Sequence, residues 1–139
     1  MSVRLLAALA VLIALASVAR AHDASDRAAI RGVIESQMRA FQRDDGESAF
    51  SFASPMIRRM FGSAEIFMDM VRQGYQPVYR PKAVEFGDLE EIAGQLAQKV
   101  HVIAPDGRPV TAVYIMTRLP DGTWRIDGCY LKAPEQHQA

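Results

Sequence analysis

The spacing of apolar residues changes within the segment Tyr75–Pro81, and this change constrains the fold more than any other feature of the 139-residue sequence. Before the segment, apolar residues recur every three or four positions, a period that predicts helices with one buried face. After it, apolar and polar residues alternate, which predicts strands. A helical first half followed by a strand-rich second half favours an α+β fold, with N-terminal helices packed on one face of a curved antiparallel sheet.

The first half predicts four helices delimited by capping residues. The first is capped by Ser25 or Asp26 and ends at Asp44-Asp45-Gly46, where Gly46 is expected to take the left-handed conformation. The others are a short helix with Phe50 and Phe52 that stops at Ser54, one from Pro55 to Gly62 capped by Ser54, and one capped by Ser63 and closed by Gly74. Pro77 and Pro81 disfavour helical geometry at Gln76 and Arg80, so Tyr75–Pro81 is predicted to be an extended connector.

The second half predicts four strands. The first contains Val84, Phe86 and Leu89, and the others span Leu96–Ala104, Val110–Leu119 and Trp124–Leu131. The turn sequences Pro105-Asp106-Gly107 and Pro120-Asp121-Gly122 join the last three, and Asp-Gly is a strong hairpin signal. An antiparallel meander is therefore expected. Both faces of the third strand carry apolar side chains, so the sequence does not select the buried face.

The N-terminal segment Met1–Ala21 has the features of a secretory signal peptide. Arg4 precedes an apolar stretch from Leu5 to Val18, and Ala19-Arg20-Ala21 supplies the small residues that signal peptidase requires. The apolar stretch is shorter than the roughly 20 residues of a spanning helix, so no stable membrane anchor is expected after cleavage. Residues 22–139 are predicted to form a single α+β domain that is periplasmic or secreted.

Charge and cysteine content narrow the function classes. Removal of Arg4 and Arg20 with the signal peptide leaves fourteen basic and sixteen acidic residues, a nearly neutral chain that gives nucleic acid no long-range attraction. Nucleic acid is therefore not an expected partner. Cys129 is the only cysteine, so no intramolecular disulfide can form and packing must hold the fold.

Several short sequences together resemble a known family. They are Phe52-Ala53-Ser54-Pro55, Met70-Val71-Arg72-Gln73-Gly74-Tyr75, Pro77-Val78-Tyr79-Arg80-Pro81, and Asp121-Gly122-Thr123-Trp124-Arg125-Ile126 with Gly128-Cys129. Over roughly Ala28 to Ala133 the chain is similar to domain of unknown function family 4864. The resemblance implies the cone-shaped α+β barrel of the nuclear transport factor 2-like, or SnoaL-like, superfamily, in which helices close a bent sheet around a cavity. It implies no activity, and no residue role is carried over.

The candidate catalytic residues are His101 and Asp127. His101 would act as a general base near neutral pH. Asp127 would be its acidic companion, or would itself abstract a proton if an apolar cavity tunes its pKa. The alternative is that His101 is a hydrogen-bonded strand residue. Cys129 lies two positions after Asp127, so the two share a sheet face, and a nearby carboxylate would raise the thiol pKa. Cys129 is therefore expected to be a small buried apolar residue rather than a nucleophile.

The candidate ligand-binding residues are four tyrosines and one arginine: Tyr75, Tyr79, Tyr114, Tyr130 and Arg80. Tyrosines that line a cavity can donate hydrogen bonds to a carbonyl ligand; the alternative is that their rings pack and their hydroxyls are solvated. Arg80 lies on the stiff connector and suits a carboxylate or phosphate. The alternative is that the arginines of this region pair with acidic neighbours such as Glu65 and Asp69.

No metal site and no cofactor are predicted. The three histidines, His22, His101 and His137, lack metal-ligand spacing. The sequence contains no glycine-rich phosphate loop, no Gly-x-Ser-x-Gly elbow and no Cys-x-x-Cys pair, which disfavours nucleotide-dependent and dithiol redox chemistry.

Three functions remain open. The first is a non-catalytic domain that binds a small apolar ligand or a protein partner in its cone, favoured by ample apolar content and few clustered polar residues. The second is a scaffold that forms a homodimer through the outer sheet face, as the resemblance implies. The third is a cofactor-free isomerase or dehydratase that uses His101 or Asp127.

Overall fold

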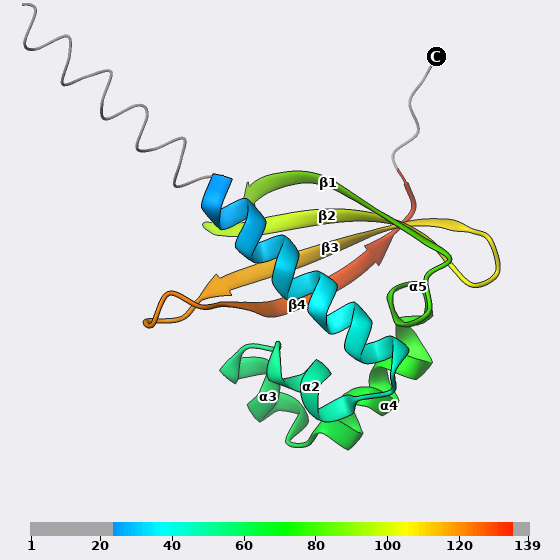
Figure 1. The fold of residues 1–139 in the computed structure, drawn as a ribbon, viewed down its shortest axis with the longest axis horizontal. Helices are drawn as coiled ribbons and strands as arrows, with labels where there is room; N and C mark the ends of the chain where they lie inside the picture. The colour runs from blue at the N-terminus through cyan, green and yellow to red at the C-terminus, as the bar shows by residue number, and fades with distance from the viewer. Residues whose placement is uncertain (1–23, 135–139) are drawn as a thin grey trace, which may run out of the picture.

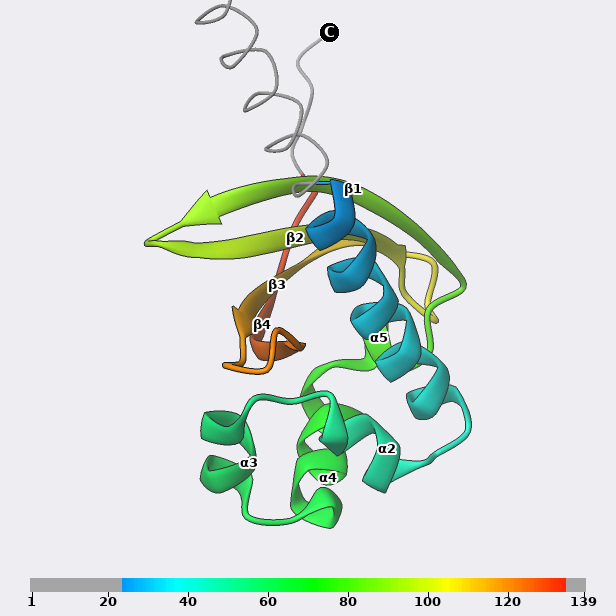
Figure 2. The ribbon, with the colours of Figure 1, turned by 60° about the vertical axis from the view of Figure 1, so that its left-hand side comes forward.

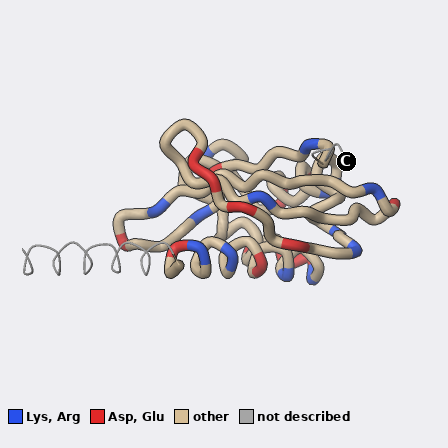
Figure 3. Tube along the Cα trace, turned by 90° about the horizontal axis from the view of Figure 1, so that it is seen from above, with Lys and Arg blue, Asp and Glu red and all other residues tan. Residues whose placement is uncertain are grey.

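The computed structural model describes residues 24–134. A helix over residues 24–42 crosses one face of a four-stranded sheet, which arches over it (Figure 1, Figure 2). The predicted signal peptide, Met1–Ala21, lies outside the described residues. No helix within residues 24–134 is long and apolar enough to span a bilayer. Figure 3 shows basic and acidic positions interspersed over the described part of the chain.

Four shorter helices follow the N-terminal one: α2 (Gly46–Ser51), α3 (Pro55–Phe61), α4 (Ala64–Gly74) and α5 (Gln76–Tyr79). The predicted caps at Ser54 and Ser63 are confirmed, because Ser54 Oγ accepts from Ile57 N and Ser63 Oγ accepts from Ile66 N. Ser25 and Asp26, predicted as caps of the first helix, lie within it. Helix α2 ends earlier than expected, since Ala53 forms a parallel bridge to Ile126 at the edge of the sheet.

The expectation for Gly46 is wrong. The left-handed residue after the N-terminal helix is Asp44, with φ 55°, and Gly46 is the first residue of α2. Gly46 is instead required by packing, because a Cβ there would lie 2.9 Å from Met68 Cγ. The sequence pattern located the chain reversal correctly but assigned the unusual backbone to the wrong residue.

The prediction of an extended Tyr75–Pro81 connector is also wrong, since Gln76–Tyr79 forms α5. Pro77 lies in the first turn, where the missing N–H costs no helical hydrogen bond. Val78 N and Tyr79 N both donate to Tyr75 O, and the side chains of Val78 and Tyr79 are buried. Arg80 does lie outside helical space, with φ −139° and ψ 57°. Burial of two side chains therefore stabilises a single turn that the prolines alone disfavour.

The sheet is an antiparallel meander in the order β1-β2-β3-β4, as expected for its last three strands. The strands are β1 (Ala83–Ile92), β2 (Gln95–Ile103), β3 (Pro109–Arg118) and β4 (Trp124–Lys132). Gly107 and Gly122 have positive φ in the two predicted Asp-Gly turns. The β1–β2 turn uses Ala93 and Gly94, both at positive φ. Bulges interrupt the ladders between Phe86 and Leu89 and between Ile115 and Met116.

The core lies between the helices and one face of the sheet. The helical stripe predicted for the N-terminal segment is buried, with Ile30, Ile34 and Phe41 no more than 2% exposed. The inward strand residues include Val100, Val102, Ala112, Tyr114, Met116 and Ile126. Packing therefore selects the face of β3 that carries Ala112, Tyr114 and Met116.

Candidate functional site: an apolar cavity beneath the sheet

A cavity of about 430 Å³ lies between the short helices and the inner face of β3 and β4. Its lining comes from five parts of the chain: Gln37, Phe41, Ala53, Ile57, Met60, Phe61, Phe67, Met70, Val71, Tyr75, Val78, Tyr114, Ile126, Gly128 and Cys129. Most of these side chains are apolar, and none of the described lining residues is charged. The cavity therefore suits an uncharged molecule.

Helices α3 and α4 form the floor of the cavity. On α4 the apolar stripe of Phe67, Met70 and Val71 faces inward, and the Phe67 ring packs against Phe41, Phe50 and Phe61 at centroid distances of 5.3–6.3 Å. Helix α3 is different, because none of its residues is buried. Met60 lines the cavity and is still 66% exposed. Part of the floor is therefore a helix whose residues all remain partly or largely exposed to solvent.

Tyr114 supplies the most unusual polar group of the cavity. Its side chain is 1% exposed, and its hydroxyl makes no hydrogen bond to a nitrogen or oxygen atom of the described residues. The only group that interacts with the hydroxyl there is the Cys129 thiol, a weak hydrogen-bonding partner. Burial, with a smaller contribution from Cys129, raises its pKa well above the ordinary value. A buried hydroxyl without a partner costs about 1–3 kcal/mol, so such a group calls for an explanation.

The other polar groups of the lining are mostly satisfied. The Tyr75 hydroxyl donates to Cys129 O at 2.9 Å, and burial raises the pKa of Tyr75. Gln37 Nε2 donates to Ala49 O at 3.1 Å. Burial raises the pKa of the Cys129 thiol to about 12, so it stays protonated at neutral pH. Tyr75, Tyr114 and Cys129 are thus neutral, and none of them can accept a proton from a substrate.

His101 and Asp127 are not brought together. His101 is exposed, with Nδ1 3.2 Å from Thr111 Oγ1, and its cross-strand neighbours are Glu85 and Thr111. Thr111 pairs with Lys132, and Asp127 lies five residues before Lys132 in β4. At about 3.3 Å per residue, this separation puts Asp127 more than about 15 Å from His101. Neither residue lines the cavity. The structure gives no shared site for the proposed acid–base pair.

Asp127 has a structural position instead. It lies at the β4 bulge, where Oδ1 accepts from Ser54 Oγ at 2.7 Å and Oδ2 accepts from Gln95 Nε2 at 3.1 Å. Because Ser54 also caps α3, Asp127 holds the start of that helix against the sheet.

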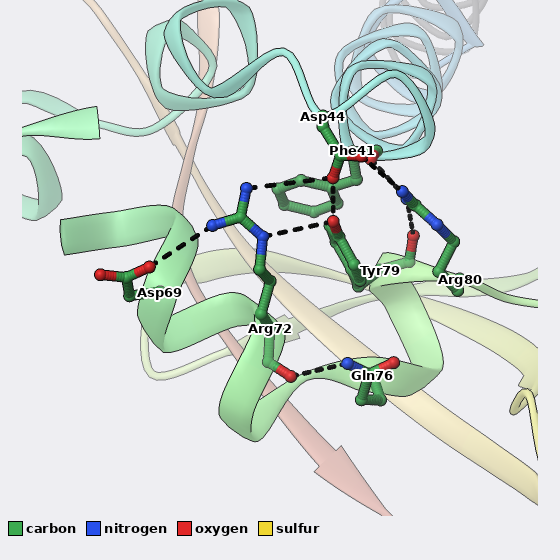
Figure 4. Close-up of polar contacts among 7 residues, drawn as sticks. All are labelled: Phe41, Asp44, Asp69, Arg72, Gln76, Tyr79 and Arg80. Carbon is green, nitrogen blue, oxygen red and sulfur yellow. Dashed lines mark hydrogen bonds and ion pairs between the residues drawn. The ribbon is translucent and has the colours of Figure 1, made fainter. Parts of the chain in front are cut away.

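Tyr79 and Arg80 belong to a charged cluster outside the cavity (Figure 4). The Tyr79 hydroxyl donates to Asp44 Oδ1, and Arg80 donates to Asp44 Oδ2 at 3.0 Å and to Phe41 O. The hydrogen bond from Tyr79, followed by the charges of Arg80 and Arg72, lowers the pKa of Asp44. Arg72 also pairs with Asp69 at 3.4 Å. Arg80 is therefore neutralised by Asp44, and the cluster ties α4 and α5 to the end of the N-terminal helix.

Of the five predicted ligand-binding residues, Tyr75 and Tyr114 line the cavity. Tyr79 and Arg80 do not, and Tyr130 is 45% exposed and also outside it. Sequence reasoning missed Gln37, Ile57, Met60 and Met70. The i, i+3, i+4 spacing of Ile57, Met60 and Phe61 is a signal for one apolar face of α3, but a core would produce the same pattern. No group of three or more His, Cys, Asp or Glu side chains within residues 24–134 is placed to hold a metal ion.

Comparison with known proteins gives a family and one structural likeness. A family model described as Domain of unknown function (DUF4864) matches residues 23–139. The fold is similar to a crystal structure of an NTF-2 like protein of unknown function from Burkholderia xenovorans LB400. The two share 14% sequence identity with a TM-score of 0.48, over 81% of this chain and 89% of that chain. No curated protein matches the sequence.

Proposed function

Since the chain belongs to the domain-of-unknown-function family DUF4864, we propose its function from its own cavity: it binds a small, uncharged, largely apolar molecule that carries a hydrogen-bond acceptor. The observation that carries the proposal is the unpartnered Tyr114 hydroxyl, buried in an apolar space of about 430 Å³. That volume lies within the roughly 300–1,000 Å³ of typical ligand pockets.

The ligand is expected to carry a hydrogen-bond acceptor because burying the Tyr114 hydroxyl without a strong partner costs free energy. Without a ligand, the Tyr114 hydroxyl loses its hydrogen bonds to water on folding and gains only a weak interaction with the Cys129 thiol. A carbonyl or ether oxygen of a bound molecule would accept that hydrogen bond and recover about 1–3 kcal/mol. A charged ligand is disfavoured because the lining offers no counter-charge.

A binding role is favoured over catalysis by the protonation of the lining. The titratable lining groups, Tyr75, Tyr114 and Cys129, all have raised pKa values and stay neutral near pH 7. An isomerase or dehydratase needs a base within reach of the bound molecule. His101 and Asp127 lie elsewhere. We therefore propose that the cavity holds its ligand without transforming it.

The first experiment is native mass spectrometry of the protein exported by a bacterial host. We expect a chain that begins at His22 and retains a non-covalent small molecule, which organic extraction would then identify. The N-terminal mass tests the proposed periplasmic or secreted location, and the subunit count tests the homodimer expectation. A chain that retains Met1 would contradict export.

A fluorescence titration tests the cavity itself. We expect saturable enhancement of the neutral apolar dye N-phenylnaphthylamine, which Met70→Trp abolishes by filling the space. Ile66→Trp is the matched control, because Ile66 lies on the same helix but is 56% exposed and outside the cavity. No saturable enhancement in the wild type, or equal loss in both variants, would overturn the proposal.

The role of Tyr114 is tested with a second dye. Prodan is a neutral naphthalene fluorophore of similar size that carries a ketone. Tyr114→Phe should weaken Prodan by a few-fold to about tenfold, the value of one hydrogen bond, and leave N-phenylnaphthylamine unchanged. Equal effects on both dyes would show that the hydroxyl does not select for an acceptor.

A further inference from the structure

A second hollow, of about 480 Å³, lies on the opposite side of α3. It is lined by Phe50, Ala53, Pro55, Arg58, Arg59, Gly62, Leu119 and Arg125. Helix α3 separates the two spaces: Ile57, Met60 and Phe61 face the apolar cavity, whereas Pro55, Arg58, Arg59 and Gly62 face this second hollow, here called the arginine groove. Unlike the cavity, the arginine groove has charged side chains in its lining.

Three arginines from two separate parts of the chain line the arginine groove. Arg58 and Arg59 come from α3, and Arg125 comes from the start of β4. Arg58 lies over the Phe50 ring at 5.3 Å from its centroid, and Arg125 Nη1 donates to Trp124 O at 3.2 Å. The Phe50 ring orients the Arg58 side chain and the Trp124 carbonyl orients the Arg125 side chain, and neither contact neutralises the arginine's charge.

The three groove arginines have no ion-pair partner among the described residues. Most other arginines of the described chain do pair, as Arg31 does with Glu35 at 2.6 Å and Arg80 with Asp44 at 3.0 Å. The charge of Arg125 does act on one carboxylate, Asp121, whose pKa is lowered first by its hydrogen bonds with Thr123 and to a smaller extent by Arg125. Asp121 is exposed and does not line the groove.

We propose that the arginine groove binds a phosphate group. Guanidinium forks match phosphate oxygens in bidentate geometry, and three of them suit a group with more than one negative charge better than a single carboxylate. The hollow provides the concave shape that a phosphate-bearing molecule needs. This site is independent of the ligand proposed for the apolar cavity, because Ala53 is the only residue that lines both.

The test is calorimetric titration of the full domain with inorganic pyrophosphate, against sodium chloride at equal ionic strength. We expect saturable binding that weakens with added salt, as screening requires. Arg58→Gln, Arg59→Gln and Arg125→Gln should each weaken it about tenfold, the value of a charge-assisted hydrogen bond. Arg27→Gln is the control, since Arg27 is an exposed arginine of the N-terminal helix outside the groove. Circular dichroism of each variant verifies folding.

A vesicle arm separates the two sources of phosphate. Binding of pyrophosphate without binding to vesicles of anionic phospholipid assigns the groove to a soluble phosphorylated compound. Vesicle binding that pyrophosphate displaces assigns it to a lipid headgroup. Absence of both, or binding that the three groove variants leave unchanged, overturns the proposal. Because the fluorescent dyes report on the cavity alone, failure here would leave the proposed function intact.

Discussion

The Ser54 hydroxyl donates a hydrogen bond to Asp127 Oδ1 at 2.7 Å, across 73 residues of sequence. Ser54 Oγ also accepts a hydrogen bond from Ile57 N and so caps α3, the helix that separates the cavity from the arginine groove. No residue of α3 is fully buried, and only Ile57 and Phe61 pack against the core, so this connection to the bulge of β4 adds to the few contacts that hold the helix. Ser54 itself is 1% exposed.

Substitution of Ser54 by Ala should therefore destabilise the domain more than loss of an ordinary cap. We expect a decrease of about 2–3 kcal/mol in the free energy of unfolding, measured by urea denaturation, because a cap and a buried hydrogen bond are lost together. Ser63→Ala, which removes only the cap of α4, should cost about 1 kcal/mol. Equal losses would show that the bond to Asp127 contributes nothing.

Two tyrosines of the cavity should respond in opposite directions to loss of the hydroxyl. Tyr75→Phe removes a hydrogen bond to Cys129 O and should lower stability by about 1 kcal/mol. Tyr114→Phe removes a buried hydroxyl without a partner, so the ligand-free protein should be as stable as the wild type or more stable by about 1–2 kcal/mol. Thermal and urea unfolding of both variants decide this, and a loss in Tyr114→Phe would reveal a partner for the hydroxyl.

Asp44 should make the domain sensitive to acid. Its pKa is lowered in the folded state from 3.8, so its contribution is fully present above the unfolded pKa and is lost as the pH falls through the lower folded value. Asp44→Asn should therefore reduce stability at pH 7, and the difference from the wild type should disappear as the pH falls below the lowered folded pKa of Asp44. Asn tolerates the left-handed backbone at this position, which keeps the comparison electrostatic. A difference in the free energy of unfolding that stays constant from pH 7 to pH 2 would contradict the linkage.

The wild type should also lose stability in acid for other reasons, because Asp45, Asp106 and Asp121 have lowered pKa values too.

Cys129 should react slowly in the folded protein. A pKa raised from 9.0 to about 12 lowers the thiolate fraction at pH 8 about a thousandfold relative to an unperturbed thiol. Iodoacetamide labelling followed by mass spectrometry should show a reaction of Cys129 at least about a hundredfold faster in urea than in buffer. Rapid labelling of the native protein would show that the thiol is ionised or that the cavity opens readily.

Much of the local structure follows from short-range features of the sequence. The helical spacing of Ile30, Ile34 and Phe41, the caps at Ser54 and Ser63, and the Asp-Gly turns were predicted correctly, since each depends on residues a few positions apart. The signal peptide prediction rests on the same kind of pattern and stays a prediction. The error at Gln76–Tyr79 arose where burial of Val78 and Tyr79 in the core overrode the local preference. At Gly46 the sequence located the chain reversal, but the left-handed residue is Asp44, two positions earlier.

The sequence by itself determined the order of helices and strands, the α+β class and the family, because periodicity, turns and family motifs are local properties of the chain. Only the tertiary structure decided which polar residues meet. It placed Tyr114 in the cavity without a partner, paired Arg80 with Asp44, separated His101 from Asp127, and gathered Arg58, Arg59 and Arg125 around one groove. These outcomes depend on strand register, bulges and the packing of α3 against β4, which bring together residues far apart in sequence.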